Sequence, residues 1–286
     1  INFELCDGYS GYLKHVKSLE PGLTSLIDSM EPDNCNSYST GGWDVTLCEY
    51  SVSYFKEGGD LLGTVGGVGQ TQSSHDLGVM NDTVQLSFIN QTFYPDNFYH
   101  MVCPYDLYEG TLKESLESKL GYYNDGYVFT PRTIEPICGE IEQDEAGTLR
   151  GNWVHPNYNT NFESEDYHIA FYDWNYDPIY KVVSIGRESG VFDNTAYSSR
   201  FIPNTDVNSR VNRDYVDVVV DGMVYCYDNS GVDGIDGVDN QEMRLLVTLY
   251  NQNTLYIAAD LNETSCASIP TQATFIANYS YLIFER

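Results

Sequence analysis

The chain has 286 residues, of which 42 are acidic and 14 are basic, so its formal net charge is −28. A surface this negative repels nucleic-acid phosphates and anionic lipids, which excludes nucleic-acid binding. Hydrophobic residues make up 42% of the chain, enough for a folded core, and no run of about 18 apolar residues could span a membrane. The length suits two domains.

The composition favours strands over helices. The chain contains 25 Tyr and 12 Phe, and aromatic residues, with Val, Ile and Thr, are enriched in β-sheets. We therefore predict a mainly β protein with an antiparallel sheet domain at residues 1–104 and a β-sandwich or barrel at residues 138–286. A short helix and a linker are expected between them, at residues 105–137.

Seven cysteines without a C-x-x-C pair indicate disulfides formed in an oxidising compartment. Pairing within each region of the chain predicts three bonds: Cys35–Cys48, Cys103–Cys138 and Cys226–Cys266. Cys6 is left over, and we expect a buried, inert thiol; a bond to another chain or to a cysteine outside this sequence are the alternatives.

Four N-x-S/T sequons are consistent with a secreted, extracellular or cell-surface glycoprotein. If the source organism modifies asparagine, they mark surface positions: Asn81, Asn90, Asn262 and Asn278.

In chain order, residues 2–20 read as two strands around a D-G-Y-S-G turn at Asp7–Gly11, and residues 21–30 as a short helix. Residues 31–42 are polar and predict a loop, and residues 48–55 alternate as a strand. The glycine-rich stretch at 57–82 predicts a hairpin between paired strands.

Three segments together resemble the lysostaphin-type zinc endopeptidase domain. Residues 57–82 resemble its G-D-x-I-G-x-x-G turn and the following H-x-H strand. Residues 12–19 resemble the strand that ends in a histidine beside the metal, and residues 103–108 resemble the closing N-P-x-x-Y-like segment. The resemblance covers residues 1–108 and implies an antiparallel β-fold.

The zinc ligands of that family are not retained. They come from an H-x-x-x-D motif, which this chain lacks, and from the second histidine of H-x-H, where Asp76 stands here. Catalytic zinc needs about three protein ligands and an open position for water. His15, His75 and Asp76 remain as a degenerate site, so we expect no peptidase activity.

The clearest helical pattern lies at residues 105–120. Four leucines form an apolar stripe, and Gly121 follows where a C-terminal cap is expected. Beyond Cys138 the alternation predicts strands throughout, at residues 148–154, 167–173, 180–186, 198–202, 215–219, 222–227, 243–250, 253–259 and 272–284.

Residues 138–153 read C-G-x-x-x-Q-D-x-x-G-T-x-x-G-N-W. With residues 173–186 and 224–228, this motif resembles secreted bacterial proteins in which a degenerate endopeptidase-like domain precedes a β-domain. Two interpretations of the motif are open. Residues 143–145 with Arg150 and His155 could supply a general acid–base pair, but a turn capped by Asp144 with an Arg150 ion pair is the commoner use of such residues.

An acidic loop follows residue 227. Calcium is bound by closely spaced carboxylates, although the EF-hand spacing is not met and a solvated loop is the simpler interpretation. No cofactor other than calcium is expected, and the candidate calcium ligands are Asp228, Asp233, Asp236 and Asp239.

The leading hypothesis is a secreted, non-catalytic structural or adhesive protein. Relative to the resembled family, the N-terminal sheet lacks its first strands, and an open edge favours self-association into a homo-oligomer or filament by β-strand addition. One alternative is a metal-dependent cell-wall or polysaccharide hydrolase built on His15, His75 and Asp76. Another is a calcium-stabilised carbohydrate-binding module that uses exposed Tyr and Trp.

Overall fold

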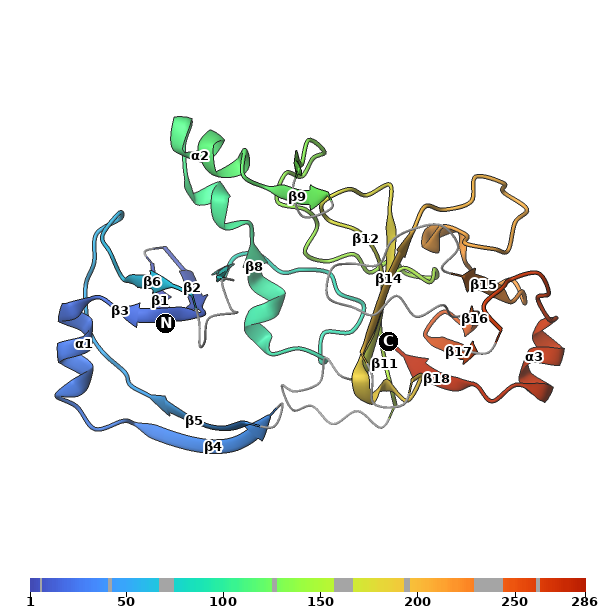
Figure 1. Cartoon of the computed structure of the whole chain (residues 1–286), viewed down its shortest axis with the longest axis horizontal. Coiled ribbons are helices and arrows are strands. Elements are labelled where there is room, and N and C mark those ends of the chain that lie inside the picture. Colours follow the sequence, from blue (N-terminus) through green and yellow to red (C-terminus); the bar gives the residue numbers. More distant parts are fainter. Residues whose placement is uncertain are drawn as a thin grey trace. The chain divides into compact units, whose positions relative to one another are not determined.

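In the computed structural model, the chain forms two compact units, Ile1–Val79 and Met80–Arg286. The structure describes residues 1–5, 7–40, 43–66, 75–124, 128–156, 167–192, 196–228, 244–260 and 263–286. Regular structure is mainly β, as predicted (Figure 1). The linker expected at 105–137 lies inside the second unit, where the Cys103–Cys138 disulfide joins its flanks.

The first unit contains three small sheets. Strands β1 (Asn2–Glu4), β2 (Tyr9–Lys14) and β7 (Asp76–Asn81) lie in that order in one sheet. β1 and β2 are antiparallel, and Asp7 and Gly8 in the turn between them have φ values of 62° and 78°, in the left-handed region that hairpin turns use. The predicted N-terminal hairpin is confirmed, but its turn is shorter than the predicted 7–11 because β2 already begins at Tyr9.

Two further strand pairs depart from the prediction. β3 (Val16–Leu19) pairs with β6 (Gly63–Val65), so the glycine-rich stretch is not a hairpin of its own. β4 (Asn34–Thr40) occupies the predicted polar loop and pairs with β5 (Trp43–Glu49). The strand expected at 48–55 therefore ends at Glu49.

Helix α1 (Pro21–Asp28) confirms the helix predicted at 21–30. Its cap is Glu20, whose carboxylate accepts the backbone N–H groups of Gly22 and Leu23 at 2.9 and 2.8 Å. Pro21 at the first helical position supplies a suitable φ and has no N–H that needs a partner.

The second unit begins with short elements: η1 (Asp96–His100), β8 (Met101–Val102), η2 (Pro104–Leu107), α2 (Gly110–Glu117), β9 (Gly121–Asn124) and β10 (Val128–Pro131). The helix predicted at 105–120 is present only in part, as the turn η2 and the helix α2, which ends at Glu117 with Ser118 as its C-cap. Gly121, the predicted cap, begins β9 instead. β9 and β10 form an antiparallel hairpin.

An eight-stranded antiparallel sheet dominates this unit, in the order β14-β13-β12-β11-β18-β17-β16-β15. The strands are β11 (Gly151–Val154), β12 (His168–Asp173), β13 (Lys181–Ile185), β14 (Tyr197–Phe201), β15 (Tyr225–Asp228), β16 (Arg244–Asn251), β17 (Thr254–Asp260) and β18 (Leu282–Glu285). β11 and β18 share only the pair Val154 and Glu285, so two four-stranded halves meet at a narrow junction.

The sheet curls around a single core. Phe201 on edge strand β14 and Tyr227 on edge strand β15 have ring centroids 5.3 Å apart, although the sheet order places them at opposite edges. All eight strands contribute to this core. The expected sandwich or barrel is thus one curled sheet with its concave face filled by apolar side chains.

Two predicted strands, at 215–219 and 272–284, are helical in part, whereas residues 282–284 lie in strand β18 as predicted. Residues 215–217 form the 3₁₀ turn η5 (Tyr215–Asp217), another such turn being η4 (Arg187–Ser189), and residues 272–278 form α3 (Gln272–Asn278). Phe275 of α3 packs with Leu246 and Ala258 on the other face of the sheet. β16 is therefore buried on both faces.

Candidate functional site

The predicted degenerate site is partly assembled in the first unit. His15 lies between β2 and β3 with a φ of 57°, and its Nε2 is 3.2 Å from Oδ2 of Asp76 on β7. His75 Nδ1 lies 3.0 Å from the carbonyl oxygen of Lys14. The site residues thus meet, but His75 contacts the backbone.

The contact between His15 and Asp76 is a two-residue ion pair at the surface. Within the described ranges, no three His, Cys, Asp or Glu side chains are placed to hold a metal ion. The side chains of His15 and Asp76 are 31% and 50% exposed, and ion pairs at such exposure contribute about 1 kcal/mol or less. Their contact holds the β2–β3 turn against β7.

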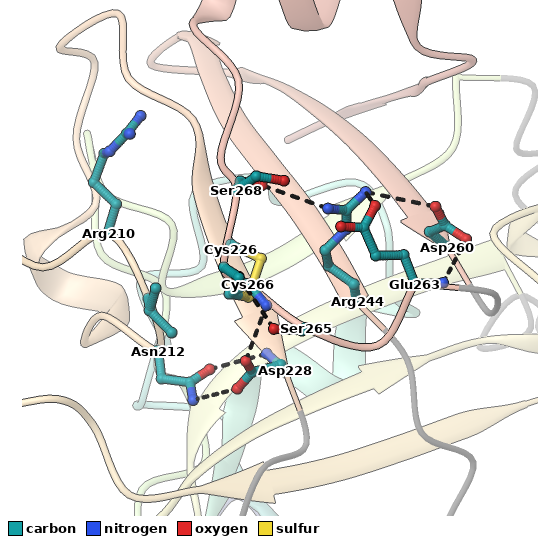
Figure 2. The surroundings of a disulfide bond; sticks show 12 residues. Arg210, Asn212, Cys226, Asp228, Arg244, Asp260, Glu263, Ser265, Cys266 and Ser268 are labelled. Carbon is teal, nitrogen blue, oxygen red and sulfur yellow. Dashed lines mark hydrogen bonds and ion pairs between the residues drawn. A yellow bond between two sulfur atoms is a disulfide. The ribbon is translucent and has the colours of Figure 1, made fainter.

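The second candidate, the calcium loop, is described only at its first residue. Asp233, Asp236 and Asp239 lie outside the described residues. Asp228 accepts hydrogen bonds from Asn212 Nδ2 at 2.9 Å and from the backbone N–H of Cys266 at 3.2 Å (Figure 2). Its carboxylate therefore supports the chain beside the Cys226–Cys266 disulfide.

Arg244 lies next to Asp228 in the sheet register and is 2% exposed. Its Nη2 is 2.8 Å from Glu263 and 3.5 Å from Asp260, and its Nη1 donates to the carbonyl of Ser268 at 3.4 Å (Figure 2). A buried guanidinium needs such partners to offset its desolvation. These contacts fasten residues 263–268 to β16 and β17.

The C-G-x-x-x-Q-D-x-x-G-T-x-x-G-N-W motif, residues 138–153, forms a turn held by hydrogen bonds to Asp144. Asp144 accepts the backbone N–H of Asn152 at 2.8 Å and that of Ile89 at 3.0 Å. Gly151 has a φ of 120°, and a Cβ there would lie 2.5 Å from Asp144 Oδ1. Both carboxylate oxygens serve as caps, which supports the structural interpretation over an acid–base pair.

A charge cluster around the buried Lys181 extends from the motif into the sheet. Arg150 Nη2 lies 2.7 Å from Glu140 and 3.2 Å from Asp173. Lys181 Nζ lies 2.5 Å from Asp173 and 3.1 Å from Asp214, with only 9% of the lysine side chain exposed. Asp173, Lys181 and Asp214 were not predicted as members of this cluster. The available signal in the sequence was Lys181, a charged residue at the start of the apolar strand β13.

Trp153, the last residue of the motif, anchors it in the core of the sheet. Its side chain is fully buried, and its Nε1 donates to the carbonyl of Leu149 at 2.9 Å. The guanidinium of Arg286 stacks 4.2 Å from the ring centroid, and its Nη2 donates to the carbonyl of Thr148 at 2.7 Å. Burial lowers the pKa of Arg286 to about 10.

The sequons differ in accessibility. Asn81 is 9% exposed, and its Oδ1 accepts the backbone N–H of Thr83 at 2.9 Å, so it is not the surface position expected for a glycan. Asn90 is half-buried, and Asn278 is exposed at the end of α3. Asn262 lies outside the described residues.

The three disulfides have the predicted pairing, and Cys6 lies outside the described residues. None of the helices that the structure describes is long and apolar enough to cross a membrane. Comparisons with protein-family models, curated protein sequences and solved structures find no match for this chain. Its function must be inferred from its own residues.

His168 makes the stability of the second unit sensitive to pH. Its ring is 8% exposed, 5.5 Å from Tyr94 and 6.2 Å from Phe93, and burial lowers its pKa from 6.5 to about 4. Below pH 6.5 the His168 imidazole binds a proton in the unfolded chain, whereas in the folded chain it binds one only near pH 4. The free energy of unfolding therefore falls as the pH is lowered from 6.5 to 4. The loss reaches roughly 3 kcal/mol at the lower end of this range.

Chemical denaturation at pH 4, 5 and 6.5 measures this loss. His168→Phe is expected to flatten the dependence, whereas His75→Phe, at an exposed position, leaves it unchanged. Equal slopes in the parent and His168→Phe would show that other groups cause it.

Proposed function

We propose that this chain is a secreted, non-catalytic structural or adhesive protein that works by self-association through its first unit. The observation that carries the proposal is the distribution of apolar side chains between the units. The described residues of the second unit bury a large apolar core. Among the described residues of the first unit, only Leu23 and Val79 have buried apolar side chains.

In the part that the structure describes, the first unit exposes apolar side chains, as the second unit does, but has almost no buried core to support them. Phe55 is 87% exposed, Leu61 is 62% exposed and Leu47 is 52% exposed, and others share this property: Leu5, Val52, Tyr54 and Val65. Monomeric soluble proteins rarely leave large contiguous apolar areas in water, and small units need additional support for their fold. Association with another chain would supply the missing burial.

Secretion is supported by the three disulfides, which persist in oxidising compartments. The exposed sequon at Asn278 is compatible with it. The charge of −28 keeps such a surface soluble despite its exposed apolar groups.

Light scattering of the purified full chain over a range of concentrations tests the proposal. We expect the mean mass to rise with concentration above 32.3 kDa, and negative-stain electron microscopy to show regular polymers. Phe55→Ser with Leu61→Ser should weaken association at least about tenfold, since two large apolar side chains contribute more than 1.4 kcal/mol. Tyr250→Ser, at a 55% exposed position in the second unit, is the control. A constant mass of 32.3 kDa would contradict self-association.

A further inference from the structure

The β4–β5 ribbon has open edges among the described residues. Its two strands form seven antiparallel residue pairs and belong to no larger sheet (Figure 1). Side chains on both faces are exposed, including Asn36, Ser37, Thr46 and Leu47. An isolated two-stranded ribbon is marginally stable in water, and each open edge presents N–H and C=O groups to another strand.

The disulfide identifies which backbone groups point outward. Cys35 and Cys48 lie directly opposite each other with Cα atoms 4.1 Å apart, the close spacing of a non-hydrogen-bonded pair. Because such pairs alternate, Ser37 and Thr46 form the next one, and their hydroxyl oxygens are 2.8 Å apart. The N–H groups of Ser37 and Thr46 therefore face away from the ribbon, on β4 and β5 respectively.

Charge distinguishes the two edges. Residues 18–55 contain no Lys, Arg or His, and the acidic residues of the ribbon strands, Asp44 and Glu49, both lie on β5. The Lys and Arg residues of the first unit are Lys14, Lys17 and Lys56. Lys17 is exposed on β3, which pairs only with β6 in the described structure and so has a second edge open. β3 thus offers a basic edge strand to the acidic edge of β5.

We propose that the outer edge of β5 in one copy of this chain pairs with the outer edge of β3 in another copy. The inference rests on the proposed self-association and specifies its contact. Because two different edges meet, the contact is heterologous, and a row of bound copies keeps one free β5 edge at one end and one free β3 edge at the other. Repetition adds further copies and produces an open filament where the rotation between copies does not close a ring.

Proline substitutions test the edge assignment. Thr46→Pro removes an outward N–H from β5, and Ser37→Pro removes the opposite outward N–H from β4. Neither removes a hydrogen bond within the ribbon, and both lose the same hydroxyl contact. We expect Thr46→Pro to weaken association at least about tenfold, a loss of 1.4 kcal/mol, and Ser37→Pro to leave it unchanged. Circular dichroism and disulfide mapping establish that both variants fold.

Charge reversal tests the partner strand. Lys17→Glu should weaken association, and adding Glu49→Lys to the same chain should restore it, whereas Lys119→Glu, exposed in the second unit, makes the same change in charge without effect. Equal effects of the two proline substitutions, or no restoration by Glu49→Lys, would overturn the contact between β5 and β3. If the parent chain still associated, the proposed function would stand. A monomeric parent would overturn both.

Discussion

Replacing Trp153 with alanine is expected to lower the free energy of unfolding of the second unit by about 3–5 kcal/mol, the range for truncating a buried aromatic side chain. Trp153 is fully buried, and its loss removes three things together. These are the packing of the core, the Nε1 hydrogen bond to Leu149, and the ring on which Arg286 stacks. Denaturant titration followed by circular dichroism measures the change.

Trp153→Phe is the matched control. It keeps an aromatic face for Arg286 but leaves the carbonyl of Leu149 without the indole donor, so we expect an intermediate loss of about 1–3 kcal/mol. If Trp153→Ala lowers the free energy of unfolding by less than about 1 kcal/mol, the motif at residues 138–153 does not stabilise the sheet.

Strands of the second unit were predictable where alternation coincided with burial. β12, β13, β16 and β17 lie within one or two residues of the predicted ranges, because their inward residues fill the core. The error at 272–284 has a local cause. Phe275, Ile276 and Tyr279 favour strands by composition, but Thr271 caps a helix by accepting the N–H of Thr274 at 3.2 Å.

The β4–β5 ribbon was missed for the opposite reason. Burial produces the apolar–polar alternation from which strands are recognised, and the described side chains of β4 are exposed. What the structure shows there is backbone pairing and the Cys35–Cys48 disulfide. The Gly41-Gly42 dipeptide between the strands was the available hairpin signal.

The candidate sites also differ in whether they could be predicted from the sequence. The cap formed by Asp144 could be predicted because its partner Asn152 is eight residues away. The charge cluster could not, because Arg150, Asp173 and Lys181 come together only when β11, β12 and β13 pair. Asp214 reaches Lys181 from the N-cap of η5. Sequence patterns report local geometry, whereas such a cluster depends on the register of the sheet.

That cluster leads to the second large expected effect. Lys181→Met should lower the free energy of unfolding by about 3–5 kcal/mol, because removing one partner of a buried ion pair leaves uncompensated charge. Asp173 retains Arg150, but Asp214 has no other cation within 4.0 Å among the described residues. Adding Asp214→Leu to Lys181→Met should recover part of the loss, since it removes the carboxylate left without its lysine.

Lys113→Met provides the comparison that separates burial from charge. Lys113 also contacts two carboxylates, Asp106 at 2.8 Å and Glu117 at 3.7 Å, but its side chain is 34% exposed against 9% for Lys181. Solvent screening limits such pairs to about 1 kcal/mol or less. Denaturant titrations of both variants at one pH and ionic strength give the difference directly. Equal losses for Lys113→Met and Lys181→Met would mean that the cluster behaves as a surface ion pair, and that the motif and β13 are held together by apolar packing alone.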